Sequence, residues 1–172
     1  MPEFYTVLVV DDDSAVRTAM RQMLERQGYA VHLAQDGPEA LEIAQDKPPD
    51  LILCDYRMPK MDGIEALKEL SNICPEAIRI LVTAHGEIDV AMSAINDAGI
   101  YKFVLKPWSP RDLAVMVKRA LEHYQLVQEG KVLMSMLDMA LQEQELRTQG
   151  LEDQILRYRQ LLGMGLGGRM VN

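Results

Sequence analysis

The sequence has few cysteines, no long hydrophobic run and a deficit of basic residues. Its two cysteines, Cys54 and Cys74, show neither metal-ligand spacing nor a disulfide framework, so we expect a reducing, cytoplasmic location. No apolar run approaches the ~18 residues of a membrane helix, and no basic segment followed by an apolar one opens the chain. These absences argue against a membrane protein and against a secreted one.

The charge balance is acidic, with a formal net charge of −8 and a pI of about 4.9. There is no run of Lys or Arg residues, so we expect no direct contact with nucleic acid, which binds through basic surface. At 172 residues the chain is long enough for one domain of ordinary size and an appendage.

Short apolar runs alternate with segments of helical periodicity. The predicted strands cover approximately residues 5–10, 29–34, 51–55, 79–83 and 102–105. Helices are predicted after each strand, including one from about Glu87 to Asp97 and one that begins at Ser109. Ser14 is the expected N-cap of the first helix, and Gly28 ends it. Strands that alternate with helices predict an α/β fold with a parallel sheet covered on both faces.

Polar residues follow the predicted strands at their carboxyl ends. Asp11, Asp12 and Asp13 follow the first strand, and Asp55, Thr83 and Lys106 stand at or after the ends of the third, fourth and fifth. Because these strand ends share one edge of a parallel sheet, we expect the side chains to converge there.

Such a cluster suits phosphoryl transfer. Crowded carboxylates repel one another, and a hard divalent cation such as Mg²⁺ removes that repulsion. Asp55 is ionised at neutral pH and can attack phosphorus without a general base, giving an aspartyl phosphate. Lys106 and the metal could neutralise the transferred group, while Thr83 could donate a hydrogen bond to it.

Four motifs in the same order and spacing resemble the receiver domain of two-component response regulators, over about residues 4–125. They are Val9-Val10-Asp11-Asp12, Asp55 with Met58-Pro59-x-Met61-Asp62-Gly63, Val82-Thr83-Ala84 and Lys106-Pro107. The resemblance implies a flavodoxin-like, doubly wound five-stranded parallel sheet of order 2-1-3-4-5. It also implies a module of phosphorelay signal transduction, not an enzyme with a separate substrate.

The resemblance assigns roles to individual residues. Asp55 would accept the phosphoryl group from a histidine kinase or phosphotransfer protein. Asp12 would ligate Mg²⁺ directly and Asp11 largely through water, with Asp55 and the backbone carbonyl of Arg57 as further ligands. Thr83 and Lys106 would hold the phosphoryl group. Phe103 stands at the switch aromatic position, where it lacks the hydroxyl of a tyrosine.

Simpler interpretations exist for single residues. Asp11 and Asp12 could cap a strand end and a helix, Phe103 could be a core residue, and Asp13 is expected to be a solvated acid in the first helical turn. His85 and Arg57 could be exposed loop residues, or they could tune water access to an acyl phosphate.

Two other functions compete with the receiver. One is a small haloacid-dehalogenase-like phosphohydrolase, with Asp11 as nucleophile and Asp13 as acid/base, although Ala15 stands where that family has Thr or Val. The other is a scaffold that only dimerises, against which the full set of acids, Thr83 and Lys106 argues.

The last third of the chain predicts helix to about Leu162. We expect a receiver domain over residues 1–125, a helical extension over 126–163 and a flexible tail over 164–172. A seven-residue frame passes through Leu137, Leu141, Leu151, Ile155, Tyr158 and Leu162, with Gln144 and Thr148 interrupting it. This pattern favours a homodimer through a coiled coil that continues the fifth helix. The alternative is a helical hairpin that folds back on the receiver.

Overall fold

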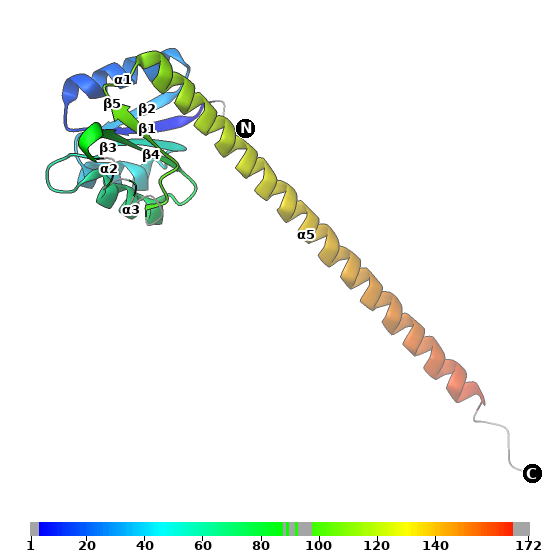
Figure 1. The fold of residues 1–172 in the computed structure, drawn as a ribbon. Helices are drawn as coiled ribbons and strands as arrows, with labels where there is room; N and C mark the ends of the chain where they lie inside the picture. The colour runs from blue at the N-terminus through cyan, green and yellow to red at the C-terminus, as the bar shows by residue number, and fades with distance from the viewer. Residues whose placement is uncertain (1–3, 88, 90–91, 93–97, 167–172) are drawn as a thin grey trace, which may run out of the picture. The chain divides into compact units, whose positions relative to one another are not determined.

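The fold was analysed in a computed structural model that describes residues 4–87, 89, 92 and 98–166. Five parallel strands form one sheet in the order β2-β1-β3-β4-β5 (Figure 1). The strands are β1 (Thr6–Val10), β2 (Ala30–Ala34), β3 (Leu51–Asp55), β4 (Ile78–Ala84) and β5 (Lys102–Lys106). All five residues of β3, the central strand, are buried, as a parallel strand covered on both faces should be. The predicted fold class and strand order are confirmed.

Helices pack on both faces of the sheet (Figure 1). Met20 and Leu24 of α1 (Ser14–Arg26) and Leu113 and Val117 of α5 (Pro110–Leu166) are buried in a single apolar cluster on one face. The helices α2 (Gly37–Asp46) and α3 (Gly63–Ile73) bury a second apolar cluster on the other face, which includes Ala40, Ala44, Ala66, Leu67 and Leu70. Alternate side chains of each strand supply the two clusters.

Three helices begin at aspartates that follow a strand. Asp36 caps α2, and Asp62 caps α3 in a capping box with Glu65. Asp13 caps α1, because its Oδ1 accepts hydrogen bonds from the backbone N–H of Ala15 at 2.8 Å and of Val16 at 3.4 Å. The prediction of Ser14 as the N-cap was therefore wrong by one residue, since Asp and Ser are equally good caps.

Gly63 allows α3 to begin directly against the end of β3. A Cβ at this position would lie 2.2 Å from the carbonyl oxygen of Asp55 and 2.8 Å from Cα of Tyr56. The N–H of Gly63 donates to the carbonyl oxygen of Tyr56 at 2.7 Å, which closes the connection. The loop between β3 and α3 is thus held close to the strand end that carries Asp55.

The segment after β4 is described only in part. A 3-10 turn, η1 (His85–Glu87), follows β4 directly. The helix predicted over 87–97 lies largely outside the described residues.

The fifth helix is much longer than the other described helices. The chain divides into two units, residues 1–126 and 127–172, and α5 runs through the boundary from Pro110 to Leu166 without a break at Gly130 or Gly150. A hairpin would need a turn in this stretch, so the hairpin alternative does not hold. Most of the predicted flexible tail, 167–172, lies outside the described residues. Within the described chain, no helix combines the length and apolarity needed to span a membrane.

Candidate functional site

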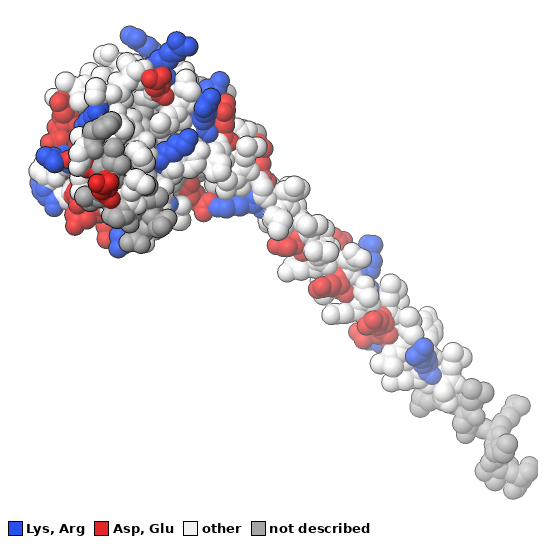
Figure 2. All heavy atoms as spheres, viewed as in Figure 1, with Lys and Arg blue, Asp and Glu red and all other residues white. Residues whose placement is uncertain are grey.

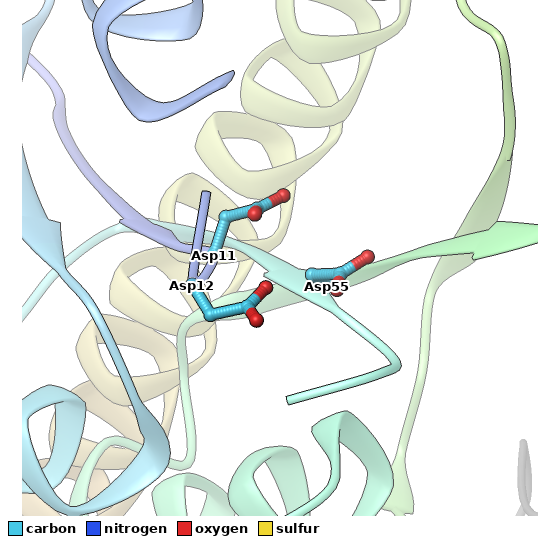
Figure 3. Close-up of side chains that lie close together, drawn as sticks. All are labelled: Asp11, Asp12 and Asp55. Atoms are coloured by element: carbon cyan, nitrogen blue, oxygen red, sulfur yellow. The ribbon is translucent and has the colours of Figure 1, made fainter. Parts of the chain in front are cut away.

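Three carboxylates gather where β1 and β3 end. The two strands are neighbours in register, with Val10 opposite Cys54, so Asp11 and Asp55 follow side by side. Asp11, Asp12 and Asp55 each offer a carboxylate oxygen within 4.8 Å of the others, and Figure 3 shows the three side chains directed to the same side of the sheet edge. Asp11 and Asp55 are buried and Asp12 is exposed. The predicted convergence of the acidic residues is confirmed.

Lys106 reaches the same cluster from the end of β5. Its Nζ lies 2.7 Å from Oδ1 of Asp55 and 3.5 Å from Oδ2 of Asp11, and its side chain is half-buried. The peptide bond between Lys106 and Pro107 is cis. A single ammonium group therefore contacts two of the three carboxylates.

The pKa values of the cluster reflect its excess of negative charge. Burial raises the pKa of Asp55, the charge of Asp11 raises it further, and the hydrogen bond from Lys106 opposes both without cancelling them. Burial lowers the pKa of Lys106, but its contacts with Asp55 and Asp11 outweigh burial and leave that pKa raised. Lys106 contacts two of the three carboxylates, and a second cation would relieve the excess of negative charge. Their oxygen donors suit Mg²⁺.

Another acidic side chain, Glu87 of η1, lies in the same region. Its Oε2 accepts hydrogen bonds from Oγ1 of Thr83 at 3.0 Å and from the backbone N–H of Ala84 at 3.1 Å. Its Oε1 lies 2.6 Å from the guanidinium of Arg57. Burial raises the pKa of Glu87, but the hydrogen bonds from Ala84 and Thr83 and the charge of Arg57 prevail and lower it.

These residues enclose one open cavity of about 520 Å³. It is lined by the acidic residues Asp11, Asp12, Asp13, Asp55 and Glu87, by Arg57 and Lys106, and by Val16, Ala84 and Gly86. We call it the site cavity. It is large enough for a phosphoryl group with its hydration, and Asp12 in its lining is exposed to solvent.

The remaining predicted residues are placed as follows. Phe103 on β5 is half-buried and packs against the apolar cluster beneath α2 and α3. Arg57 lines the site cavity, and its side chain is 83% exposed despite the ion pair with Glu87. The side chain of His85 lies outside the described part of the chain, so its suggested role stays a prediction.

Sequence reasoning missed Glu87. The residue was regarded only as the beginning of a helix. The sequence does contain one signal, because Glu87 stands three residues after Ala84. At a helix N-terminus, a glutamate at this spacing accepts a hydrogen bond from the backbone N–H of the N-cap residue. That spacing predicts the contact with Ala84, but not the contacts with Thr83 and Arg57.

Comparisons with known proteins agree with this geometry. Residues 7–118 match the family model of the response regulator receiver domain. The hydrogenase transcriptional regulatory protein HoxA of Cupriavidus necator is 38% identical over 117 residues, which is 68% of this chain and 24% of that protein. The regulatory protein AtoC of Escherichia coli is 36% identical over 136 residues, or 79% of this chain and 29% of that one.

A solved structure shows the same fold. The crystal structure of a response regulator receiver domain protein from Clostridium thermocellum aligns with a TM-score of 0.67 and 29% identity, and covers 72% of this chain and 99% of that one. The chain thus spans about a quarter of the length of the curated relatives it matches, 24% and 29% for the two above.

Proposed function

The chain belongs to the response regulator receiver family, whose members signal by phosphorylation, and we propose that its Asp55 accepts the phosphoryl group from a histidine kinase or phosphotransfer protein. One observation carries the proposal. The buried carboxylate of Asp55 lies 2.7 Å from Lys106 and within 4.8 Å of Asp11 and Asp12, and it lines an open cavity.

Mg²⁺ is the metal that this donor set suits. Asp11, Asp12 and Asp55 would hold it, together with the backbone carbonyl of Arg57 that the family resemblance adds. The ion would supply positive charge next to the transferred phosphoryl oxygens. This charge would balance a cluster of three carboxylates of which Lys106 contacts two, Asp11 and Asp55.

The protein's own residues perform the transfer. A carboxylate oxygen of Asp55 forms the new bond to phosphorus as the bond from phosphorus to the donor's imidazole nitrogen breaks. Lys106 already contacts Oδ1 of Asp55, so it is placed to neutralise the phosphoryl oxygens. Thr83 would donate its hydroxyl to one of them. The chemistry is stoichiometric phosphorylation and dephosphorylation of this chain, without turnover of a separate substrate.

The phosphohydrolase alternative is not favoured. It needs the carboxyl group of Asp13 as an acid/base, yet this group is engaged as the N-cap of α1 by two backbone N–H groups. The nucleophile it needs, Asp11, is almost completely buried and accepts a hydrogen bond from the N–H of Asp13 at 2.9 Å. The family match extends over residues 7–118 and leaves the receiver as the supported function.

Binding of a phosphoryl mimic tests the proposal. Beryllofluoride with Mg²⁺ should bind the wild-type chain with a stoichiometry of one, measured by isothermal titration calorimetry. Asp55→Asn keeps the shape of the side chain but removes the charged oxygen that bonds beryllium, so it should show no binding. Asp62→Asn is a matched control, because Asp62 caps α3 outside the site cavity. Binding by Asp55→Asn would refute the assignment.

The output that we propose is self-association through α5 as a parallel two-stranded coiled coil. Between residues 127 and 162, positions that alternate by three and four residues form one line along the helix, which we call the seam. The seam consists of Val127, Gly130, Met134, Leu137, Leu141, Gln144, Thr148, Leu151, Ile155, Tyr158 and Leu162. Its large apolar side chains from Met134 onward are more than half exposed, so they are available to a second copy.

Charge placement supports a parallel partner. Acidic and basic side chains are distributed along this unit with uncharged surface between them (Figure 2). Arg147 comes directly before the seam position Thr148, and Glu152 comes directly after the seam position Leu151. Oppositely charged residues five positions apart at such places can pair between two parallel helices. Because the chain carries a net charge of −8, we propose that output passes through this protein contact and not through direct contact with nucleic acid.

A further inference from the structure

Glu87 holds hydrogen-bond donors that a phosphoryl group on Asp55 would need. Its Oε2 accepts from both the Thr83 hydroxyl and the Ala84 N–H, at 3.0 Å and 3.1 Å. Thr83 is 1% exposed, and the only other acceptor near its hydroxyl among the described residues is the carbonyl oxygen of Ala84, which is more distant at 3.5 Å. Within the described residues these two donors point at a single carboxylate oxygen.

The position of Glu87 is not that of an ordinary surface acid. Its side chain is 11% exposed, and it lines the site cavity together with Asp55 and Lys106. The guanidinium of Arg57, from the loop after β3, holds its second oxygen at 2.6 Å. Like a phosphoryl group, the Glu87 carboxylate is negatively charged and its oxygens accept hydrogen bonds. It contacts two donors of β4, Thr83 and Ala84, and the cationic side chain of Arg57.

A capping role explains only part of this arrangement. A glutamate three residues after a helix N-cap normally accepts from the N-cap backbone N–H, and the contact with Ala84 fits that pattern. Capping requires neither the hydroxyl of Thr83 nor the ion pair with Arg57. The ion pair joins two residues that line the site cavity, Arg57 and Glu87.

We propose that the Glu87 carboxylate competes with the phosphoryl group for Thr83 and Ala84, and so sets how readily Asp55 is phosphorylated. This inference rests on the proposed function, because it needs Thr83 to face a phosphoryl group on Asp55. Two anions cannot accept the same hydroxyl proton, and their charges repel. Phosphorylation therefore displaces Glu87 and separates it from Arg57, while Glu87 slows the transfer without taking part in the chemistry.

Removal of the competitor should strengthen binding of the phosphoryl mimic. Affinity for beryllofluoride is measured by calorimetry at saturating Mg²⁺ and constant pH, in the chain of 172 residues. Glu87→Ala should bind roughly tenfold more tightly than wild type, the scale of a charge-assisted hydrogen bond. Glu87→Gln should show a smaller gain, because its neutral amide oxygen still accepts from Thr83 but no longer repels the mimic.

Glu69→Gln is the matched control. Glu69 is exposed on α3 and does not line the site cavity, and the substitution changes the net charge by the same amount. It should leave the affinity unchanged. Saturating Mg²⁺ ensures that the lost charge does not act through metal binding.

The direction of the effect separates competition from structural support. If Glu87 only supports η1, its removal should lower the melting temperature and leave the affinity for the mimic equal or weaker. Equal or weaker affinity in Glu87→Gln, with normal binding by wild type, overturns the competition. Absence of binding by wild type overturns the phosphoacceptor assignment itself and the competition with it, so the two failures are distinguishable.

Discussion

At the scale of single residues, Asp55 opposes folding in its charged form. Its pKa is raised, first by burial and then by Asp11, with Lys106 only partly compensating. A carboxyl group whose pKa is higher in the folded state binds protons more tightly there than in the unfolded chain. Its contribution to the free energy of unfolding therefore falls as pH rises from the ordinary carboxyl pKa of 3.8 through the raised value.

We accordingly expect Asp55→Asn to be more stable than wild type near neutral pH when Mg²⁺ is chelated. The excess in melting temperature should be a few degrees and should shrink as the pH is lowered toward 4, where wild-type Asp55 becomes protonated. Thermal unfolding in EDTA between pH 4 and pH 8 measures the difference. Added Mg²⁺ should stabilise wild type alone. A less stable Asp55→Asn at every pH would show that the ion pair with Lys106 outweighs the burial of the charge.

The residues of the cluster were predictable for a geometric reason. Asp11, Asp12, Asp55 and Lys106 follow strands, and the ends of parallel strands share an edge whatever the details of the loops. Glu87 was not predictable in the same way, because its contacts depend on the conformation of a three-residue turn. The N-cap of α1 was predicted at Ser14 but is Asp13. Two good capping residues stand next to each other there, and only the local backbone conformation decides between them.

At the scale of elements, the polar interruption of the seam should limit the proposed self-association. Gln144 and Thr148 occupy two consecutive seam positions, where apolar side chains would be buried between helices. Replacing both with Leu should tighten self-association at least tenfold, because burial of each Leu contributes roughly 1.5–3 kcal/mol. Sedimentation velocity over a range of protein concentrations measures the change.

The control for the seam is Gln142→Leu, which adds the same apolar side chain one position outside it. We expect no tightening from this variant. If Gln142→Leu and the double variant associate equally, the helices associate through nonspecific apolar contacts and have no defined seam. If neither differs from wild type, α5 does not pair with a second copy.

The elements themselves follow from periodicity, with one ambiguity that periodicity could not resolve. Apolar runs and turn residues located all five strands to within about one residue. In the extension, the same heptad frame was compatible with one long helix or with a hairpin. Gly130 and Gly150 stand in this stretch, and a Gly within a helix costs only about 1 kcal/mol relative to Ala. In the structure, both glycines lie within α5 with open space around the missing Cβ.

At the scale of the whole molecule, the sheet order was predictable from the family motifs, and the proposed output depends on how the site connects to α5. Lys106 contacts Asp55, and α5 begins at Pro110, so only residues 107–109 separate the two. The first turns of α5 are anchored to the sheet by buried side chains such as Leu113 and Val117. A displacement of Lys106 would therefore occur only four residues before the first residue of α5, the helix that carries the seam.

Occupation of Asp55 should accordingly change self-association of the whole chain. A phosphoryl mimic would draw Lys106 from the Asp55 carboxylate toward new oxygens, and this shift acts at the residues that lead into α5. A coupling of ordinary size would alter the dimer dissociation constant on the order of tenfold. The measurement is sedimentation velocity with Mg²⁺, with and without beryllofluoride.

Asp55→Asn should show no response, and a fragment of residues 1–126, which lacks the seam, should stay monomeric in both conditions. A response by that fragment would place the interface on the receiver face, and an unchanged mass of the full chain at every concentration would remove self-association as the output.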